Sequence, residues 1–558
     1  MRPDVLTEKS YQSHQTAQHA YDPLLANYST LTSLIEKRCE LSKNAPFLIY
    51  RDGDTRREWS YGDFYTEVLK YAYFMQEHLG LKSGDRVAVA AHNHDQAVFT
   101  AFACWLMGYA YVPLNMTESE ERINFVIENS ECKALFALKE YTEKLAHVKD
   151  MLPRIQHFIQ ISGAKSSGWE RFSDKKYKND YNPLVDVNRE TESLVVFTSG
   201  TTGKPKGVVL DHGNLLADAH AIAEWFKFDA TDRAMTILPI HHVNGLILTL
   251  LTVFYSGGST VLNRKFSASN YFNVLQEERC TFGSVVPTIL SFLGETYESF
   301  NKPESLKDYF LICGAGPLTV ELSQRFMEKF GIKIQHGYGL SETVVYSCYL
   351  PKDLSESEYQ EMMYEHGFPS IGCAIGCNEM AIHDEEGNAL AENERGEIVI
   401  RGQNIMQGYF KRPEANAEAF EFGWFRSGDE GFYLTDNRGR QFFFITGRLK
   451  ELIIRGGVNY APLEIDEILS GIKGVRIGLA VGFENNFYGE EVGAFIVKEE
   501  GASISAEDIL SICSENMPRG KCPKVVVFGK EAPVTATGKY QRNKLKHLFI
   551  DHKDTQFT

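Results

Sequence analysis

Cysteine is scarce and unpaired in this sequence of 558 residues. The ten cysteines form no CxxC pair and have no accompanying histidine pattern of a zinc site. We therefore interpret them as reduced, mostly buried thiols. The first 23 residues also lack the apolar stretch of a secretion signal, which predicts a cytoplasmic protein.

Positive charge is in deficit. The chain has 58 Lys and Arg against 74 Asp and Glu, a formal net charge of −16. This balance argues against nucleic acid as the main partner, although a local basic pocket for a nucleotide stays compatible with it. With 43% hydrophobic and 24% charged residues the composition is ordinary for a globular protein. The length exceeds the roughly 250 to 300 residues at which single cores stop growing, so we expect two or more domains.

Long uncharged stretches are also few. Residues 96–115 carry no charge, but Gly108 and Pro113 interrupt them. Together with the preceding DRVAVAA they divide into a strand (86–91), a helix (about 95–107) and a second strand (109–113), which is a βαβ unit. We therefore expect no integral membrane segment.

The same alternation of helix and strand continues through most of the chain, which predicts an α/β fold for the main body. Near the C-terminus the elements become shorter and more charged, with helices in APLEIDEILSGI and SAEDILSICSENM and strands in GLAVGF and EVGAFIV. These elements predict a compact α+β unit. We place the boundary so that residues 1–447 form a large N-terminal domain of stacked α/β subdomains and residues 448–558 form a small C-terminal domain.

The segment TSGTTGKPKG, residues 198–207, lies between two short apolar runs and is predicted to be a loop between strands. Its glycines let successive N–H groups converge, and its hydroxyl and ammonium groups add further donors, so it suits a polyphosphate. Gly200 and Gly203 are too close for a Walker loop, and Lys204 is followed by Pro205. A flexible linker is the alternative, but linkers are seldom flanked by buried strands.

Five further motifs follow in a fixed order. CGAGPL and QHGYGLSET each come after a short apolar run, as loops at the ends of parallel strands do. GWFRSGDEG, TGRLKELIIRGGVNYAPLEI and VTATGKYQRNKL complete the set. In combination these motifs resemble the adenylate-forming superfamily of acyl- and aryl-CoA synthetases, nonribosomal adenylation domains and firefly luciferase, over about residues 30 to 548. The resemblance is greatest to acyl-CoA synthetases.

The resemblance implies a two-step ligase reaction. A carboxylate would attack the α-phosphate of ATP to give an acyl-adenylate and pyrophosphate, and a thiol would then displace AMP. The resemblance implies that Glu342 binds Mg²⁺ and that Ser341, where the family commonly has Thr, contacts the α-phosphate. The residues that would hold the β- and γ-phosphates are Thr198, Ser199, Gly200, Thr201, Thr202, Gly203 and Lys206.

The nucleoside and the moving parts are assigned in the same way. Adenine would lie between Tyr338 and the backbone of Gly314, Ala315 and Gly316, and Asp429 would bind the ribose with help from Arg448. A surface Asp in a Gly-rich turn is the alternative for Asp429. Lys539 resembles the catalytic lysine, and Lys450 falls at the hinge that would let a mobile C-terminal domain alternate between the two steps.

The thiol is predicted to be CoA, because no carrier domain is attached. A ligase that loads a carrier protein, or a lactone-forming relative, is the alternative. The residues that would line the pantetheine channel are Arg455, Gly456, Gly457 and Asn459. Arg455, Lys521 and Lys524 could pair with CoA phosphates or be ordinary surface charges.

The acid is predicted to be neutral, and short, medium-chain or aromatic. The family motif places His242 at the gate of the acyl site, whereas His241 is interpreted as structural. The expected walls are Val243, Asn244, Val286, Pro287, Thr288, Cys313, Gly337, Gly339 and Val345, which include neither a cation for a second carboxylate nor an acid for an amino group. The segment PSIGCAIGCNEMAI departs from the family by having Cys and Ile where prolines are usual.

Other classes are less compatible with these residues. A nucleotide-binding scaffold without activity is disfavoured because Lys539 and Glu342 are both present. Nothing in the sequence points to the luciferin site of an oxygenase. We expect a monomer or a homodimer.

Overall fold

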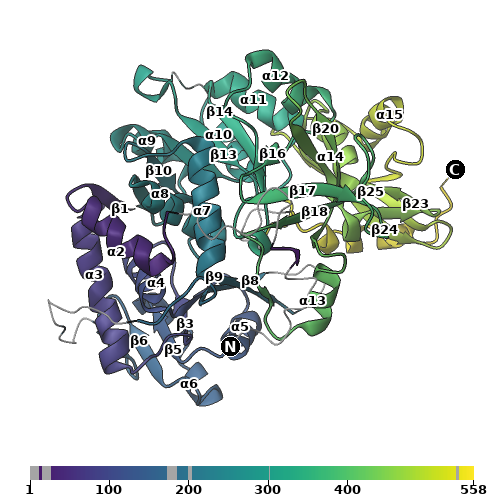
Figure 1. Ribbon diagram of the computed structural model, residues 1–558. Helices are drawn as coiled ribbons and strands as arrows, with labels where there is room; N and C mark the ends of the chain where they lie inside the picture. The colour runs from purple at the N-terminus through teal and green to yellow at the C-terminus, as the bar shows by residue number, and fades with distance from the viewer. Residues whose placement is uncertain are drawn as a thin grey trace.

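The computed structural model of the chain describes residues 12–14, 27–172, 177, 185–198, 204–298, 300, 302–535 and 540–557 (Figure 1). Two large sheets, a smaller third sheet and a separate C-terminal unit make up this part of the chain. The predicted α/β class, with a large N-terminal domain and a smaller C-terminal one, is confirmed.

The first sheet contains the predicted βαβ unit. Strand β3 (Arg86–Ala90), helix α4 (Asp95–Met107) and strand β4 (Ala110–Leu114) agree with the prediction to within about one residue, and β3 and β4 are parallel. The strand order is β19-β9-β8-β4-β3-β5-β6-β7. The remaining strands are β5 (Ala134–Ala137), β6 (His157–Gln160), β7 (Glu170–Arg171), β8 (Glu192–Thr198), β9 (Lys206–Asp211) and β19 (Gly408–Tyr409).

The second sheet has the order β16-β15-β14-β13-β12-β10-β11-β1-β2. Its strands are β1 (Pro46–Asp52), β2 (Thr55–Ser60), β10 (Arg233–Thr236), β11 (Ser259–Asn263), β12 (Phe282–Val285), β13 (Phe310–Cys313), β14 (Lys333–Tyr338), β15 (Cys348–Tyr349) and β16 (Cys373–Ala374). Strands β10, β12, β13 and β14 are parallel neighbours. The glycine-rich segments after β13 and β14 therefore leave the same edge of the sheet, where ligands of such sheets bind.

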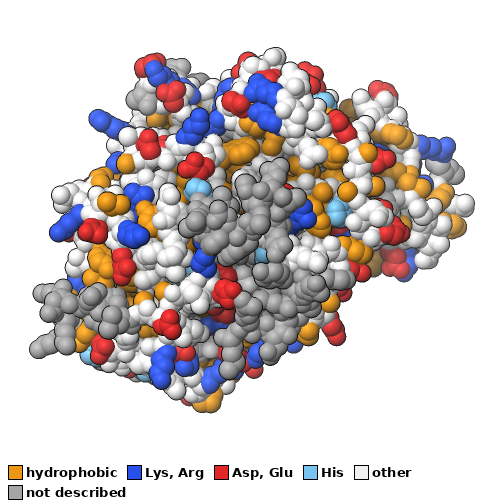
Figure 2. Space-filling model, in the orientation of Figure 1, with side chains coloured by type: hydrophobic (Ala, Val, Ile, Leu, Met, Phe, Trp, Pro, Cys, Tyr) orange, Lys and Arg blue, Asp and Glu red, His pale blue; other side chains and the backbone are white. Residues whose placement is uncertain are grey.

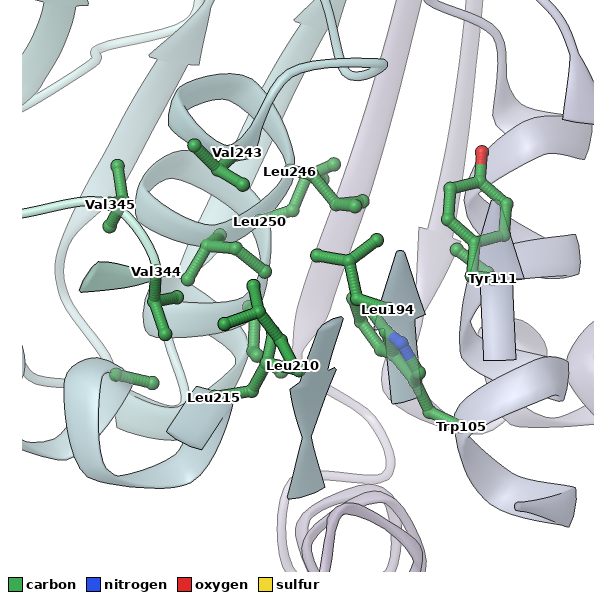
Figure 3. Close-up of a cluster of buried hydrophobic side chains, with 14 of the residues drawn as sticks. Trp105, Tyr111, Leu194, Leu210, Leu215, Val243, Leu246, Leu250, Val344 and Val345 are labelled. Carbon is green, nitrogen blue, oxygen red and sulfur yellow. The ribbon is translucent and has the colours of Figure 1, made fainter. Parts of the chain in front are cut away.

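Helices α4, α7 (His212–Phe226) and η4 (Asn244–Leu251) share one buried core with residues of both large sheets. In Figure 1 helix α7 stands in the centre of the molecule. Helix α4 is buried on nearly all sides, which explains why its sequence shows no polar face. In Figure 3 the π-helix η4 presents Val243, Leu246 and Leu250 to this core. No helix within the described ranges is long and apolar enough to cross a membrane.

The other helices of the large domain cover the outer faces of the sheets or connect their strands. They are α2 (Leu31–Leu41), α3 (Tyr61–Tyr73), η1 (Phe74–His78), α5 (Glu120–Ser130), η2 (Lys139–Tyr141), α6 (Val148–Met151), α8 (Thr252–Ser256), η5 (Ala268–Asn270), α9 (Tyr271–Glu277), α10 (Pro287–Thr296), η6 (Glu304–Leu306), α11 (Val320–Phe330), η7 (Ser341–Thr343), α12 (Glu356–Gln360), η8 (Glu361–Glu365) and α13 (Pro413–Ala419). All ten cysteines are free and buried, as predicted.

A four-stranded antiparallel sheet lies next to the C-terminal unit. Its strands are β17 (Asn378–His383), β18 (Gly396–Gly402), β20 (Phe425–Thr435) and β21 (Gln441–Arg448). The C-terminal unit follows the short helix η9 (Leu449–Glu451) and has hydrophobic cores of its own. Its elements are β22 (Ile453–Arg455), β23 (Val458–Tyr460), α14 (Pro462–Ser470), β24 (Val475–Asn485), β25 (Gly489–Lys498), α15 (Ala506–Asn516), β26 (Val525–Gly529), η10 (Arg542–Lys544) and η11 (Lys546–His552).

Two helix starts in the C-terminal unit agree with the sequence. Pro462 is the first residue of α14, where its missing N–H costs nothing. Ser505 caps α15 and forms a reciprocal pair with Asp508, which satisfies two backbone donors at the helix start.

Polar contacts join the two domains. The Glu467 carboxylate on α14 accepts hydrogen bonds from the Val320 N–H, at 3.1 and 3.2 Å, at the start of α11. Burial raises the pKa of Glu467 to about 8. Arg395 of the large domain forms an ion pair with Glu464 at 2.5 Å. One apolar side chain of α14, Leu463, also packs against the core of the large domain.

Candidate active site

Glu342 stands at the centre of the site, in the 3-10 turn η7 just after β14. Its side chain is almost fully buried, and its Oε1 accepts a hydrogen bond of 2.8 Å from the Tyr409 hydroxyl. Its main-chain oxygen accepts another, also 2.8 Å, from the Met406 N–H. Burial and the neighbouring Glu342 raise the pKa of Tyr409 well above its usual value, so the phenol stays a donor.

Tyr409 also links Glu342 to the predicted phosphate loop. The ammonium of Lys206 lies 4.5 Å from the centre of the Tyr409 ring, which is cation–π contact. Strand β19, which carries Tyr409, pairs with β9, which Lys206 begins. A cation, an aromatic ring and a carboxylate therefore form one row across the end of the first sheet.

The phosphate loop connects two antiparallel strands of one sheet, β8 and β9, as predicted. Thr198 ends β8, and its hydroxyl donates to the Lys206 carbonyl at 3.4 Å. Both flanking strands belong to the same sheet, which disfavours the alternative of a flexible linker. Ser199, Gly200, Thr201, Thr202 and Gly203 lie outside the described residues.

The predicted ribose site is brought together across three strands. The Tyr338 hydroxyl donates to Asp429 Oδ2 at 2.6 Å, and Arg448 Nε lies 3.1 Å from Asp429 Oδ1. Asp429 is buried within strand β20, so the alternative of a surface turn is wrong. The Asp429 charge raises the pKa of Arg448, which keeps the guanidinium charged.

On one side of the predicted adenine slot the backbone packs too closely against its neighbours to carry a side chain at Gly314. A Cβ on Gly314 would lie 2.6 Å from the Gly337 carbonyl and from the Tyr346 hydroxyl, so only glycine fits there. The next residue, Ala315, has a φ of +61°, a left-handed conformation that turns the chain away from β13. This close approach places the Gly314–Gly316 loop against β14, the strand that ends at Tyr338.

The expected acyl pocket contains a polar network that the sequence did not predict. Asn244 Nδ2 donates to the Tyr346 hydroxyl at 3.1 Å, and the Ser284 hydroxyl donates to Asn244 Oδ1 at 2.6 Å. All three side chains are buried. Their chemistry gave no signal in the sequence, because single polar residues within apolar runs are common.

Four of the other predicted wall residues are buried in two hydrophobic cores. Val243 and Val345 belong to the core that α7 crosses, whereas Val286 and Cys313 belong to the core on the far side of the second sheet. The rings of His241 and His242 are 4.5 Å apart. Burial and the neighbouring His242 hold the pKa of His241 well below its usual value, so that ring is neutral.

Some predicted site residues do not join this group. Lys539 lies outside the described residues, and Lys450 is exposed on η9. Arg455, Gly456, Gly457 and Asn459 belong to the β22–β23 hairpin, whose two glycines take the positive φ values that a two-residue turn requires. Figure 1 shows this hairpin at the outer end of the C-terminal domain, away from β8 and β9.

The chain matches known proteins along most of its length. A family model described as "AMP-binding enzyme" matches residues 35–410, and one described as "AMP-binding enzyme C-terminal domain" matches residues 464–539. The chain belongs to the AMP-binding enzymes. The superfamily predicted from the motifs is therefore confirmed.

Relatives of this AMP-binding enzyme are named as CoA ligases. It is 31% identical to the oxalate–CoA ligase of Arabidopsis thaliana over 477 residues, 85% of this chain and 90% of the relative. It is 32% identical to the 2-succinylbenzoate–CoA ligase of Bacillus pumilus over 508 residues, 90% of this chain and 95% of the relative. These relatives confirm the predicted enzyme class, an AMP-forming acid–thiol ligase.

A solved structure agrees with the fold of the enzyme. The o-succinylbenzoate CoA synthetase of Bacillus subtilis in complex with ATP and magnesium ion is 27% identical, with a TM-score of 0.77 over 92% of this chain and 99% of that one. The same synthetase in complex with its acyl-adenylate intermediate is 26% identical, with a TM-score of 0.78.

Proposed function

We propose that this AMP-binding enzyme activates a carboxylic acid with ATP and transfers the acyl group to CoA. The observation that carries the proposal is that β14 links two groups, because Tyr338 ends this strand and Glu342 lies in the turn that follows it. The first is the row of Lys206, Tyr409 and Glu342, and the second is the cluster of Asp429, Tyr338 and Arg448. The row of Lys206, Tyr409 and Glu342 would offer charged groups to a polyphosphate and its metal. The cluster around Asp429 would offer a hydrogen-bond acceptor to a ribose.

The residues present fit a magnesium–nucleotide complex. Glu342 supplies a carboxylate oxygen, the ligand type that Mg²⁺ prefers. Within the described residues, no group of three or more His, Cys, Asp or Glu could hold a metal by itself. This donor set suits an ion held mainly by substrate phosphates. When bound, Mg²⁺ would neutralise phosphate charge as the acid approaches.

The protein groups then divide the first step between them. Lys206 would hold the leaving pyrophosphate, and Ser341 would contact the α-phosphate. Asp429 would accept hydrogen bonds from the ribose hydroxyls while Arg448 fixes its orientation. The acid's oxygen would bond to the α-phosphorus as the bond to pyrophosphate breaks, with Lys539 orienting the attack.

We also propose the domain division and the alternation of the C-terminal domain. Strand β21 ends at Arg448, and the first core residue of the C-terminal domain is Ile453, which supports a boundary at residues 447 and 448 with Lys450 at the hinge. The hairpin of Arg455 to Asn459 would have to move to reach the adenylate. Polar interdomain contacts are of the kind that allow such a movement.

Free CoA is our proposed thiol. Lys524 and Arg519 line a surface depression of about 420 Å³ on the C-terminal domain, which offers cations for a phosphate. Lys521 is paired with Glu464, and Arg455 with Glu491 at 2.7 Å, so these two are less accessible to a ligand. A carrier protein's thiol, or lactone formation, is the alternative outcome.

We propose a neutral acid as the substrate. Three relatives are named for other acids. Two are the ligases of oxalate and 2-succinylbenzoate given above, and the third, 29% identical over 93% of this chain and 97% of its own, is the sulfoacetate–CoA ligase of Cupriavidus necator. The predicted pocket of this chain nevertheless favours a neutral acid. Val243, Val286 and Val345 make the wall largely apolar, and the predicted pocket residues include no Lys or Arg. The Asn244, Ser284 and Tyr346 network would receive a polar substituent of a neutral acid.

A carboxylic-acid panel tests the proposal. We expect exchange between ATP and labelled pyrophosphate only with the right acid, and AMP and thioester formation once CoA is added. Exchange that CoA does not alter would favour the carrier-protein alternative. A preference for oxalate or sulfoacetate would overturn the assignment of a neutral acid. Replacement of Glu342 by Gln should abolish the exchange, and full exchange by that variant would contradict the site.

A further inference from the structure

The chain is strained immediately after the proposed magnesium ligand. Val344, two residues beyond Glu342, has φ of +63° and ψ of −76°. These values are close to the γ-turn conformation that is rare and strained, and a β-branched side chain is especially unfavourable there. Val344 is fully buried, so solvent does not relieve the strain. Figure 3 shows Val344 and Val345, the latter one of the expected acyl-pocket residues, beside the helix from which Val243 and Leu246 project.

One side chain holds the backbone on both sides of this strained residue. Asn404 Nδ2 lies within hydrogen-bond distance of the Thr343 carbonyl, at 3.1 Å, and of the Tyr346 carbonyl, at 3.3 Å. Thr343 precedes Val344 and Tyr346 follows it, so the Asn404 amide links the backbone on both sides of Val344. Asn404 is itself fully buried, and its position after β18 is far from residues 341–346 in the sequence.

Two further buried side chains fix the Asn404 amide. Its Nδ2 also lies 2.8 Å from Asp218 Oδ1, on the central helix α7, and 3.1 Å from Asn378 Oδ1, so its two N–H groups are shared among four acceptors. The Asn378 amide donates back to Asn404 Oδ1. Burial raises the pKa of Asp218 well above its usual value.

The same segment also holds Glu342 directly. Met406, two residues after Asn404, donates its N–H to the Glu342 carbonyl, and Tyr409 donates its hydroxyl to the Glu342 carboxylate. Three residues of the segment 404–409 thus contact the turn of residues 342–346. They fix a proposed metal ligand at one end of the turn and the pocket residue Val345 at the other.

We propose that Asn404 is a positioning residue that, held by Asp218 and Asn378, keeps Val344 in its strained conformation and so sets the geometry of both Glu342 and the acyl-pocket wall. The proposal rests on the proposed function, since it concerns the adenylation site. It assigns Asn404 no contact with substrate. A strained residue persists only where several surrounding contacts hold it in place. Loss of the Asn404 amide should therefore let the turn of residues 342–346 relax.

The first test replaces Asn404 by Ala and measures ATP–pyrophosphate exchange and nucleotide binding. We expect exchange at saturating substrates to fall at least about tenfold and the KM for the acid to rise, because both ends of the turn move. By calorimetry, AMP should bind the variant nearly as well as the wild type, whereas the gain in ATP affinity that Mg²⁺ provides should be lost. Unchanged exchange and unchanged Mg²⁺ dependence would overturn the proposal.

A matched control separates positioning from general stability. Asn485 is also a buried asparagine, and its Nδ2 donates to several backbone carbonyls, including Thr555 at 2.9 Å, in the C-terminal domain. Asn485→Ala should lower the unfolding temperature by a similar amount without changing the exchange reaction or its Mg²⁺ dependence. If it lowers exchange as much as Asn404→Ala does, the positioning role is wrong.

Three more variants keep the test decisive if Asn404→Ala folds poorly. Asp218→Asn keeps a side-chain oxygen acceptor for the Asn404 amide and should keep exchange within about twofold, whereas Asp218→Ala should behave like Asn404→Ala. Glycine tolerates a φ of +63°, so adding Val344→Gly to Asn404→Ala should recover part of the lost exchange. A double variant that is no better than Asn404→Ala would contradict the strain argument. Failure of the proposed function would instead appear as a wild-type enzyme without exchange on any acid.

Discussion

Removal of the Tyr409 hydroxyl is the sharpest perturbation of the proposed metal site. Tyr409→Phe keeps the ring against Lys206 and deletes only the donor that lies 2.8 Å from Glu342 Oε1. A hydrogen bond to a charged group contributes about 1.5–3 kcal/mol, and both side chains are almost fully buried here. At about 1.4 kcal/mol per factor of ten, we expect a loss of about tenfold to 100-fold in kcat/KM for MgATP.

The assay is ATP–pyrophosphate exchange over a series of Mg²⁺ concentrations. The hydroxyl orients a metal ligand, so the variant should need more Mg²⁺ to reach half of its maximal rate, while the KM for the acid changes little. Tyr271→Phe is the matched control, because the buried Tyr271 hydroxyl bonds that of Tyr309 at 2.8 Å, away from the site. An unchanged Mg²⁺ requirement in Tyr409→Phe, or an equal shift in the control, would refute the reasoning.

Three further outcomes follow from the described contacts. Gly314→Ala puts a Cβ 2.6 Å from the Gly337 carbonyl, and such overpacking costs about 1–3 kcal/mol. The variant should therefore unfold at a lower temperature, and its affinity for AMP, measured by calorimetry, should fall. The Glu467 pKa of about 8 lies above its unfolded value of 4.5, so its contribution to stability is complete below pH 4.5 and is lost as pH rises through 8. Glu467→Gln should remove that part of the pH dependence of thermal unfolding, and an identical profile would contradict it. Lys524→Ala should raise the KM for CoA several-fold with no effect on exchange, and equal effects on both half-reactions would argue against a phosphate contact.

Local features of the fold could be predicted because the residues that determine them are close in sequence. The βαβ unit of β3, α4 and β4 follows from alternating apolar runs and a left-handed Gly108, and the capped start of α15 follows from Ser505 and Asp508. The class of the enzyme was also predictable, because its motifs consist of glycines and polar residues in a fixed order.

The geometry of the site was less accessible, because it depends on residues far apart in the chain. The contact of Tyr409 with Glu342 spans 67 residues, and that of Asn404 with Asp218 spans 186. Neither pair has a spacing that a sequence pattern could show. Asp429 was singled out from its motif as the ribose-binding residue, but its place inside a strand rather than a turn depends on the pairing of β20 with β21. The strained Val344 has no signal at all, since valine normally avoids positive φ.

The exposed apolar side chains of the β22–β23 hairpin affect the free energy of the present domain arrangement. Ile454 and Val458 are 52% and 51% exposed, and Figure 2 shows hydrophobic side chains on the surface over the C-terminal domain. Contact between apolar side chains and water is unfavourable at roughly 25 cal/mol per Å², so this arrangement of the domains carries a cost that another arrangement could remove. The contacts of Glu467 and Arg395 that hold the domains in the present arrangement are polar, so water can replace them. The present arrangement and one that covers the hairpin can therefore lie close in free energy. If the proposed alternation of the C-terminal domain holds, occupancy of the nucleotide site would decide which arrangement the enzyme populates.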